Sequence, residues 1–284
     1  MRSRSPGTTE WRRLFAAEAG APHPDLALLC LLIGTEADPS LDREGIDTAR
    51  RLLDRLADEA VSGRGGHRPD TPWAWAAAVG ELLGGRCGFR GRPGDYQRLE
   101  SSLLHRVLRR RRGLPILLSV LWIEVARRAG AQVHGVSLPG HFVVGFGPPD
   151  DLVLADPFAG GRVLTAADAE LLVAAATGEP LVPAMLGPAR TLDIVRRVLN
   201  NIRAWAGPRP ECCDVSLWAL DLCLLLPSPP PRLRFERAQL LVQRGDFVTG
   251  ARELDTFADE VAGTDEATAD RARRQARVAR ARLN

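Results

Sequence analysis

Apolar residues recur at helical spacing through most of the first 130 positions. In one segment they lie three or four residues apart, which predicts an amphipathic helix that begins at Asp42 or Arg43. The apolar positions of this helix are Ile46, Ala49, Leu52, Leu53 and Leu56. Further helices are predicted over residues 11–18, 24–35, 73–83 and 99–112, whereas the polar residues 1–9 are expected to be disordered.

The segment "PILLSVLWIEVARRAG" is apolar on most sides. Pro115 suits the first position of a helix, and Gly130 is expected to end it. Glu124 and Arg127 are three residues apart on this helix and are expected to pair. A helix with so little polar surface is expected in the middle of a domain.

Short strand-like runs follow the apolar helix: "QVHGVSL", "HFVVGF" and "LVLADP". Helices beside consecutive strands predict an α+β domain. After "GGRVLTAADAELLVAA" the chain is predicted to be helical to its end. In this tail, a helix, a turn at Gly245 and Asp246, and a helix with Phe247 and Ala251 resemble one tetratricopeptide unit, whose stacked neighbours would be the flanking helices.

Composition narrows the class of protein. The 284 residues are 45% hydrophobic, which is enough for one large domain or two. No apolar run is long enough to span a bilayer, and residues 24–34 lack the basic flank of a signal peptide, so we expect a cytoplasmic protein. The five cysteines form no C-x-x-C pair, which favours reduced structural thiols and no metal or cofactor.

Two segments raise the question of a bound anion. "GGRCGFRGRPGDY" is rich in glycine but has neither spacing of a phosphate-binding loop, and its Cys87 is interpreted as a loop thiol, the alternative being a cysteine carried into a cleft. Four arginines, residues 109–112, end a predicted helix, where they suit its dipole. A solvated helix end is favoured there over an anion site.

His141 and Asp156 lie on either side of a predicted hairpin. Directly opposite residues of an antiparallel pair share a face, with Cβ atoms about 4.5–5.5 Å apart. If Val143 faces Leu154, His141 faces Asp156, and the carboxylate can orient the imidazole as in a catalytic triad. In the alternative, His141 only starts a strand and Asp156 only opens an Asp-Pro turn.

Four stretches together resemble the SirB1 family of transglutaminase-like proteins: "CGFRGRPGDYQRLESSLLHRVL", "RRRGLPILLSVLWIEVARRAG", "GVSLPGHFVVGF" and "LADPFAGG". The resemblance covers residues 24–164 well and the helical tail more loosely. It implies a papain-like core over residues 99–178, with its central helix on a small antiparallel sheet. A helical region, residues 1–98, would precede the core, and an all-α, tetratricopeptide-like region, residues 179–284, would follow it.

The resemblance also implies a cysteine at the start of the central helix, a histidine that begins one strand and an aspartate on the next. His141 and Asp156 match the latter two, but Pro115 stands where the cysteine is expected. Ser119 is one turn further on, and its hydroxyl is expected to bond back to the helix backbone. Asp95 and Tyr96, from the segment before the helix, are candidates to line the cleft.

Two functions remain open. In the first, the protein is a binding or scaffolding module that keeps the His141–Asp156 cleft and binds a peptide or protein through its C-terminal helices. In the second, it is a hydrolase, acyltransferase or cyclase, with specialised metabolism as one setting. His141 is then the general acid or base, and Asp156 orients it on a small-molecule or peptide substrate. The small net charge of +3 disfavours nucleic acid as a partner.

Overall fold

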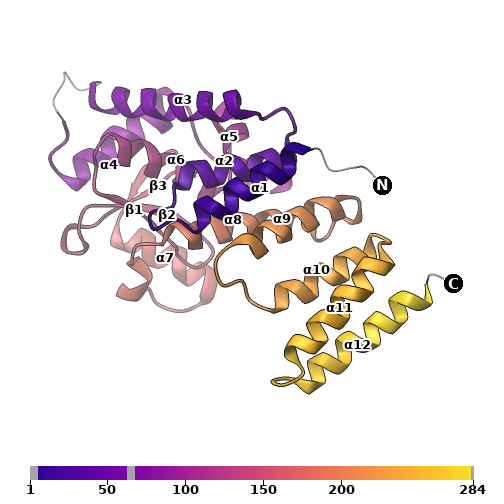
Figure 1. Ribbon diagram of the computed structural model, residues 1–284. Coiled ribbons are helices and arrows are strands. Elements are labelled where there is room, and N and C mark those ends of the chain that lie inside the picture. The colour runs from indigo at the N-terminus through magenta and orange to yellow at the C-terminus, as the bar shows by residue number, and fades with distance from the viewer. Residues whose placement is uncertain (1–5, 63–67, 283–284) are drawn as a thin grey trace. The chain divides into compact units, whose positions relative to one another are not determined.

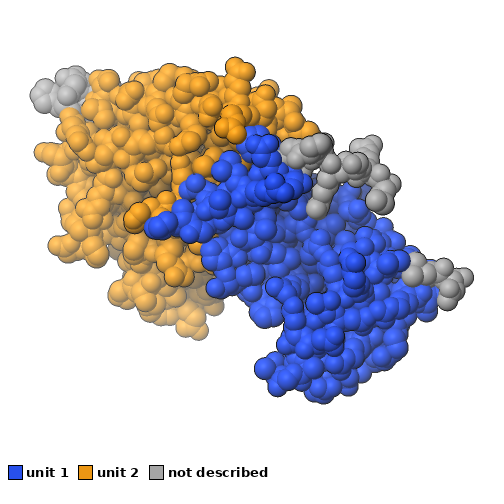
Figure 2. Space-filling model, in the orientation of Figure 1, with its two compact units in different colours: residues 1–22, 199–284 blue, residues 23–198 orange. Residues whose placement is uncertain are grey.

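The computed structural model describes residues 6–62 and 68–282 (Figure 1). Two compact units divide the chain: residues 23–198 form one, and residues 1–22 with 199–284 form the other (Figure 2). The domain boundaries expected from the sequence, at residues 98 and 178, stay predictions. No helix of the described ranges is long and apolar enough to cross a membrane.

The unit of residues 23–198 is built around a buried helix, α6 (Pro115–Arg128), in which every residue from Pro115 to Ala126 is buried. This confirms the central helix expected from the sequence. Its apolar surface is covered in part by other helices: α2 (Leu26–Ala37), α3 (Arg43–Ser62), α4 (Pro72–Gly80) and α5 (Leu104–Arg110). Helix α3 begins at Arg43, and its apolar stripe faces the interior as predicted.

Two predicted helices differ from the structure. The helix expected over residues 99–112 is split into a 3-10 turn, η3 (Leu99–Ser102), and α5, because Leu103 is extended and Ser101 and Ser102 are buried. Serine favours such breaks because its side chain competes for backbone hydrogen bonds. The helix expected over residues 73–83 ends at Gly80 and continues as a π-helical turn, η1 (Glu81–Arg86).

The sheet has four antiparallel strands in sequence order: β1 (Val133–Val136), β2 (Val143–Phe146), β3 (Val153–Asp156) and β4 (Arg162–Leu164). Helix α6 packs against β1 and β2. On another side, α7 (Ala166–Thr177) buries Ala169 and Val173 against apolar residues of the strands. The strand β4 was not predicted, since three residues are too few for a periodic signal.

The predicted register of the β2–β3 hairpin is wrong by two residues. Gly145 pairs with Leu154, not with Leu152. The reason is that β2 continues through the fully buried Phe146 before Gly147 turns the chain at φ 91°. The connection then contains a 3-10 turn, η4 (Pro149–Asp151). A shift of two residues keeps the same side chains on each face, so the predicted face survives the error.

The other unit is helical. Its helices are α1 (Pro6–Ala19), α9 (Cys213–Leu225), α10 (Arg232–Gln243), α11 (Phe247–Val261) and α12 (Glu266–Ala281), with a 3-10 turn, η6 (Pro210–Cys212), before α9. The boundary between the units falls within α8 (Thr191–Ala206). The disorder expected for residues 1–9 is wrong from Pro6 onward, and residues 1–5 lie outside the described ranges.

Helices α10, α11 and α12 pack through small residues. The buried positions of this core are Ala238, Ala251, Leu254, Phe257, Ala258, Ala269, Ala272, Ala276 and Ala279. Alanine side chains allow the helix axes to approach closely. At Gly250 the approach is closer still, because an added Cβ would lie 2.6 Å from a methyl group of Val242. The turn predicted at Gly245 is present, with a φ of 89° that favours glycine.

Candidate functional site

His141 and Asp156 meet in the structure. Nε2 of His141 lies 3.0 Å from Oδ1 of Asp156, and the side chains are 14% and 10% exposed. The separation is that of an ion pair, whereas the angles do not meet those of a hydrogen bond. His141 precedes β2 by two residues and Asp156 ends β3, so the pair is diagonal across the hairpin rather than directly opposite.

Asp156 also stabilises the turn that follows it in the chain. Its Oδ1 accepts a hydrogen bond from the backbone N–H of Phe158 at 2.9 Å, and its carbonyl accepts one from Gly161 at 2.8 Å. The Asp-Pro turn and the histidine partner, which are alternatives in the sequence, are therefore both present. The turn fixes the carboxylate, which in turn limits where the imidazole of His141 can lie.

Two aromatic rings extend the site. The ring of Phe158 meets that of His141 edge to face, with centroids 6.2 Å apart, and Tyr96 lies 6.0 Å from Phe158 on another side. Partial burial and then the charge of Asp156 raise the pKa of Tyr96 above its ordinary value. Tyr96 is 49% exposed and keeps its proton at neutral pH, so its hydroxyl can both donate and accept a hydrogen bond to a ligand.

Asp95, the neighbour of Tyr96, stabilises the short segment in which both residues lie. It is buried and accepts a hydrogen bond from the backbone of Arg92 at 2.8 Å, which caps the 3-10 turn η2 (Pro93–Gln97). Ser101 donates to it at 3.3 Å, and a guanidinium nitrogen of Arg110 lies 3.6 Å away. These contacts hold the segment that presents Tyr96, and none of them involves the histidine pair.

The start of α6 offers no reactive group in this structure. Pro115 is its first residue and is buried. The hydroxyl of Ser119 is buried and donates to the carbonyl of Phe142 at 3.2 Å. The expected bond back to the helix is therefore wrong, because the carbonyl of Phe142, the residue before β2, supplies the acceptor. This bond ties α6 to the residue that follows His141.

Cys87 is a free, half-buried thiol. Burial, followed by the negative charge of Glu59, raises its pKa above the ordinary value. A thiol in that state is protonated at neutral pH and is a poor nucleophile. The carbonyl of Cys87 accepts a hydrogen bond from Arg111 at 3.0 Å, so Arg111, like Arg110, has a partner in the protein.

Arg197 of α8 supports the histidine, although nothing in the sequence indicated it. Its guanidinium donates to Ser137 at 2.5 Å and to the carbonyls of Leu138 and His141 at 3.5 and 3.3 Å. It also lies 5.4 Å from the ring centre of Phe142. One side chain thus fixes both ends of the turn that carries His141.

The glycine-rich segment is a packing surface for the loop that follows Asp156. A Cβ on Gly84 would lie 1.7 Å from the carbonyl oxygen of Gly160, and one on Gly91 would lie 1.8 Å from the ring of Phe158. The backbone N–H of Gly91 also donates to Phe158 at 2.9 Å. These glycines are required because no side chain fits between the segment and the loop.

A second histidine–aspartate pair lies apart from this site in the fold. Nε2 of His105 is 3.2 Å from Asp38, and both residues are buried beside a cavity of about 410 Å³. Burial lowers the pKa of His105, although the charge of Asp38 opposes the shift. Ser40 and Arg106 complete the shell around Asp38 at 2.6 and 2.8 Å. The several partners of Asp38 are typical of a structural pair, although Nδ1 of His105 is buried without a hydrogen-bond partner among the described residues.

The buried central helix, the antiparallel sheet and the histidine–aspartate pair define a transglutaminase-like core. Comparison of sequences agrees, because residues 47–200, more than half of the chain, match the transglutaminase-like superfamily. The chain belongs to this superfamily. Residues 202–284 match the tetratricopeptide repeat, which agrees with the repeat-like helices α10 and α11.

Relatives of the chain span bacteria and mammals. A UPF0162 protein of Xylella fastidiosa strain 9a5c is 34% identical over 181 residues, which are 62% of this chain and 64% of that protein. F-box only protein 21 of Mus musculus is 29% identical over 133 residues, which are 44% of this chain and 21% of that protein. The chain thus spans less than two thirds of the length of either relative.

A crystal structure of menin, described as revealing the binding site for Mixed Lineage Leukemia protein, aligns with 90% of this chain and 75% of that one. The TM-score of 0.44 and the identity of 14% are too low to support a conclusion.

Proposed function

We propose that the protein is a binding or scaffolding module that keeps the cleft of a transglutaminase-like fold without its nucleophile. The observation that carries this proposal is Pro115 at the first position of α6, the place that the resemblance to SirB1 proteins assigns to the cysteine. A cysteine at a helix start is held as a thiolate in part by the helix dipole, and proline has no group to replace it. The hydroxyl of Ser119 is already bonded to Phe142.

The C-terminal helices are the proposed partner site. A cavity of about 290 Å³ is formed by α10, α11 and α12. Its apolar lining is Val242, Leu254 and Val278, and its polar side chains are Gln239, Gln243, Arg274, Gln275 and Arg282. Stacked helix pairs of the tetratricopeptide kind bind peptides on such surfaces. The partner is therefore expected to be a peptide or protein segment. The protein itself is expected to be cytoplasmic.

A general acid–base enzyme is the second candidate, and one observation favours it. His141 is nearly buried, and Asp156 contacts its Nε2, which leaves Nδ1 to meet a substrate. A carboxylate in that position orients an imidazole and stabilises its charged form. Such an enzyme would transfer a proton on a small-molecule or peptide substrate without a covalent intermediate.

Substitutions in the organism that makes the protein separate the two functions. His141→Ala and Asp156→Asn are compared with Val278→Asp, a change at an exposed position of α12 that lines the proposed partner site. The module proposal expects that the phenotype of a deletion strain is restored by the first two variants and not by the third. A deletion phenotype that persists with His141→Ala and Asp156→Asn, both folded, would instead establish the enzyme.

A further inference from the structure

A third cavity, of about 570 Å³, opens over the side of the sheet that α7 covers. Its floor includes Leu154 and Leu164 of two neighbouring strands, and Ala166 of α7 lines one wall. Leu181 and Leu186, from the segment that contains the 3-10 turn η5 (Pro183–Leu186), line another. A volume of several hundred cubic ångströms with mostly apolar walls is typical of sites for small molecules.

The segment that forms the second wall is attached to the sheet. Ala189 donates its backbone N–H to the carbonyl of Gly135 on β1 at 2.8 Å, and Pro188 forms a β-bridge with Val136. Leu181, Met185 and Leu186 pack against the apolar core between the strands and α7. The wall is therefore built from main-chain pairing and apolar packing.

His134 is the ionisable side chain that sets the chemistry of the cavity. It lies on β1 opposite Gly145, and a Cβ on Gly145 would come within 2.8 Å of both its Nε2 and a methyl group of Leu152. The imidazole thus extends over the neighbouring strand at a position where only glycine leaves room. Burial lowers the pKa of His134, so the ring is neutral at physiological pH.

The other polar side chains of the lining are less suited to a ligand than His134, because Gln132 is exposed and the hydroxyl of Thr165 already donates to Asp168 at 2.8 Å. Among the described residues, the ring of His134 forms no hydrogen bond or ion pair with the protein. Asp150 is the other ionisable residue of the lining, and it is exposed on the loop between β2 and β3. A lining with one neutral imidazole and one exposed carboxylate disfavours multiply charged ligands, since their desolvation would have no compensation.

We propose that this cavity binds a small, uncharged and largely apolar molecule that donates a hydrogen bond, from a phenol or a similar hydroxyl, to the imidazole of His134. The site is separate from the proposed roles of the His141 cleft and the C-terminal helices. An apolar body is held by Leu154, Leu164 and Leu186, and the hydroxyl selects the orientation. A peptide or a second copy of the chain would need a long open surface, whereas this cavity is bounded by the sheet, α7 and the 181–188 segment.

The test compares 1-naphthol with naphthalene as probes of the full chain, by calorimetric titration and thermal unfolding. His134→Phe keeps an aromatic ring but removes the acceptor. We expect it to weaken 1-naphthol binding by about tenfold, the equivalent of one hydrogen bond of about 1.4 kcal/mol. Naphthalene, which has no hydroxyl, is expected to bind wild type and His134→Phe equally.

A matched pair of substitutions locates the probes. Ala166 and Ala167 are neighbouring exposed residues of α7, but only Ala166 lines the cavity. Ala166→Trp is expected to abolish the binding of both probes, and Ala167→Trp to leave it unchanged. Because both positions are exposed, neither change disturbs the buried core.

Three results would overturn the proposal. The first is 1-naphthol binding that Ala166→Trp leaves intact, and the second is an equal loss of both probes in His134→Phe. The third is a concentration-dependent dimer that Ala166→Trp abolishes, which would identify a second copy of the chain as the occupant. Since none of these variants alters His141 or the C-terminal helices, the proposed function is tested independently.

Discussion

At the scale of single residues, Arg197 is the side chain on which the position of His141 most depends. Its guanidinium satisfies the hydroxyl of Ser137 and two carbonyls of the turn, while its charge lies against the ring of Phe142. Hydrogen bonds to a charged group are worth about 1.5–3 kcal/mol when the other partner is left unsatisfied.

Arg197→Met is therefore expected to lower the free energy of unfolding by about 2 kcal/mol, as measured by urea denaturation. Arg196→Met is the matched control, because Arg196 is the preceding residue of α8 and, within the described part of the chain, pairs with Asp193 alone, at the surface. A surface pair contributes less than about 1 kcal/mol. Equal losses in the two variants would contradict the role given to Arg197.

Gly91 is a second residue whose substitution is expected to change the free energy of unfolding. An added Cβ would overlap the ring of Phe158, so Gly91→Ala must displace either the ring or the segment. Overpacking of this kind costs about 1–3 kcal/mol. Gly94→Ala, three residues further on, meets nothing within 4 Å and is expected to leave the free energy of unfolding within about 0.5 kcal/mol of wild type. Urea denaturation of both variants checks the difference, and a neutral Gly91→Ala would show that the close approach is absent.

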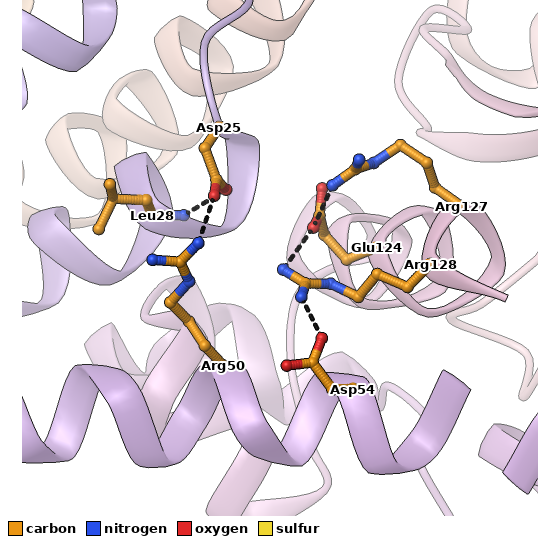
Figure 3. A network of polar contacts seen from close by, with 7 residues as sticks. All are labelled: Asp25, Leu28, Arg50, Asp54, Glu124, Arg127 and Arg128. Atoms are coloured by element: carbon orange, nitrogen blue, oxygen red, sulfur yellow. Dashed lines mark hydrogen bonds and ion pairs between the residues drawn. The ribbon is translucent and has the colours of Figure 1, made fainter. Parts of the chain in front are cut away.

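At the scale of elements, a buried carboxylate joins α6 to α3 (Figure 3). Glu124 is 1% exposed and contacts Arg127 at 2.9 Å and Arg128 at 3.1 Å, so the pairing expected from the sequence is confirmed. Arg128 also forms an ion pair with Asp54 of α3, whereas Arg127 is 55% exposed. Loss of Arg128 would therefore leave Glu124 paired with the exposed Arg127, whereas loss of Arg127 would leave the contact between Glu124 and Arg128 in place.

Arg128→Ala is expected to cost about 3 kcal/mol of unfolding free energy, because it leaves the buried carboxylate of Glu124 with only an exposed partner. Arg127→Ala is expected to cost less than about 1 kcal/mol. Chemical denaturation of the two variants gives the comparison. A larger loss in Arg127→Ala would mean that the exposed arginine, not the one shared with α3, neutralises Glu124.

A second buried carboxylate joins helices of the all-α unit. Asp221 of α9 contacts Arg12 of α1 at 2.7 Å and Arg237 of α10 at 2.6 Å. Burial alone would raise the pKa of Asp221, but the hydrogen bonds and charges of Arg237 and Arg12 outweigh it and lower the pKa below the ordinary value. The ionised carboxylate therefore stabilises the fold above the pKa of the unfolded chain, about 3.9.

This stabilisation is lost as the pH falls from about 3.9 through the lowered folded-state pKa. Asp221→Asn is expected to reduce the free energy of unfolding by about 3 kcal/mol at pH 7, with a difference from wild type that shrinks in acid below about pH 4. Asp214→Asn, at the exposed start of the same helix, is the control and should cause no measurable change. A loss for Asp221→Asn that is independent of pH would contradict the ionic origin.

Sequence patterns predicted the elements better than their exact limits or pairings. The apolar run from Pro115 and the alternating runs before Asp156 were sufficient for α6 and three strands, because burial dictates both patterns. The register failed by two residues, since it depends on where the loop at Gly147 begins. In the site, the motif predicted His141 and Asp156, whereas Arg197 comes from a helix about 50 residues later and carries no local signal.

At the scale of the whole molecule, the chain combines a transglutaminase-like core with tetratricopeptide-like helices. The core retains three features that a thiol enzyme uses. They are the buried start of α6, the contact between Nε2 of His141 and Asp156, and the turn before β2 that Arg197 holds in place. The proposal of a core without its nucleophile depends on whether Pro115, the first residue of α6, stands where a cysteine would face His141.

Pro115→Cys tests this claim most directly. The alkylation rate of the new thiol by iodoacetamide is followed against pH, with its peptide resolved by mass spectrometry from those of the five native cysteines. We expect a midpoint well below the ordinary thiol pKa of about 8.5, because the helix start and an imidazole that accepts the proton of the thiol both favour the thiolate. The midpoint is expected to rise when His141→Ala is added. A midpoint at or above about 8.5 that does not respond to His141→Ala would show that residue 115 does not face His141.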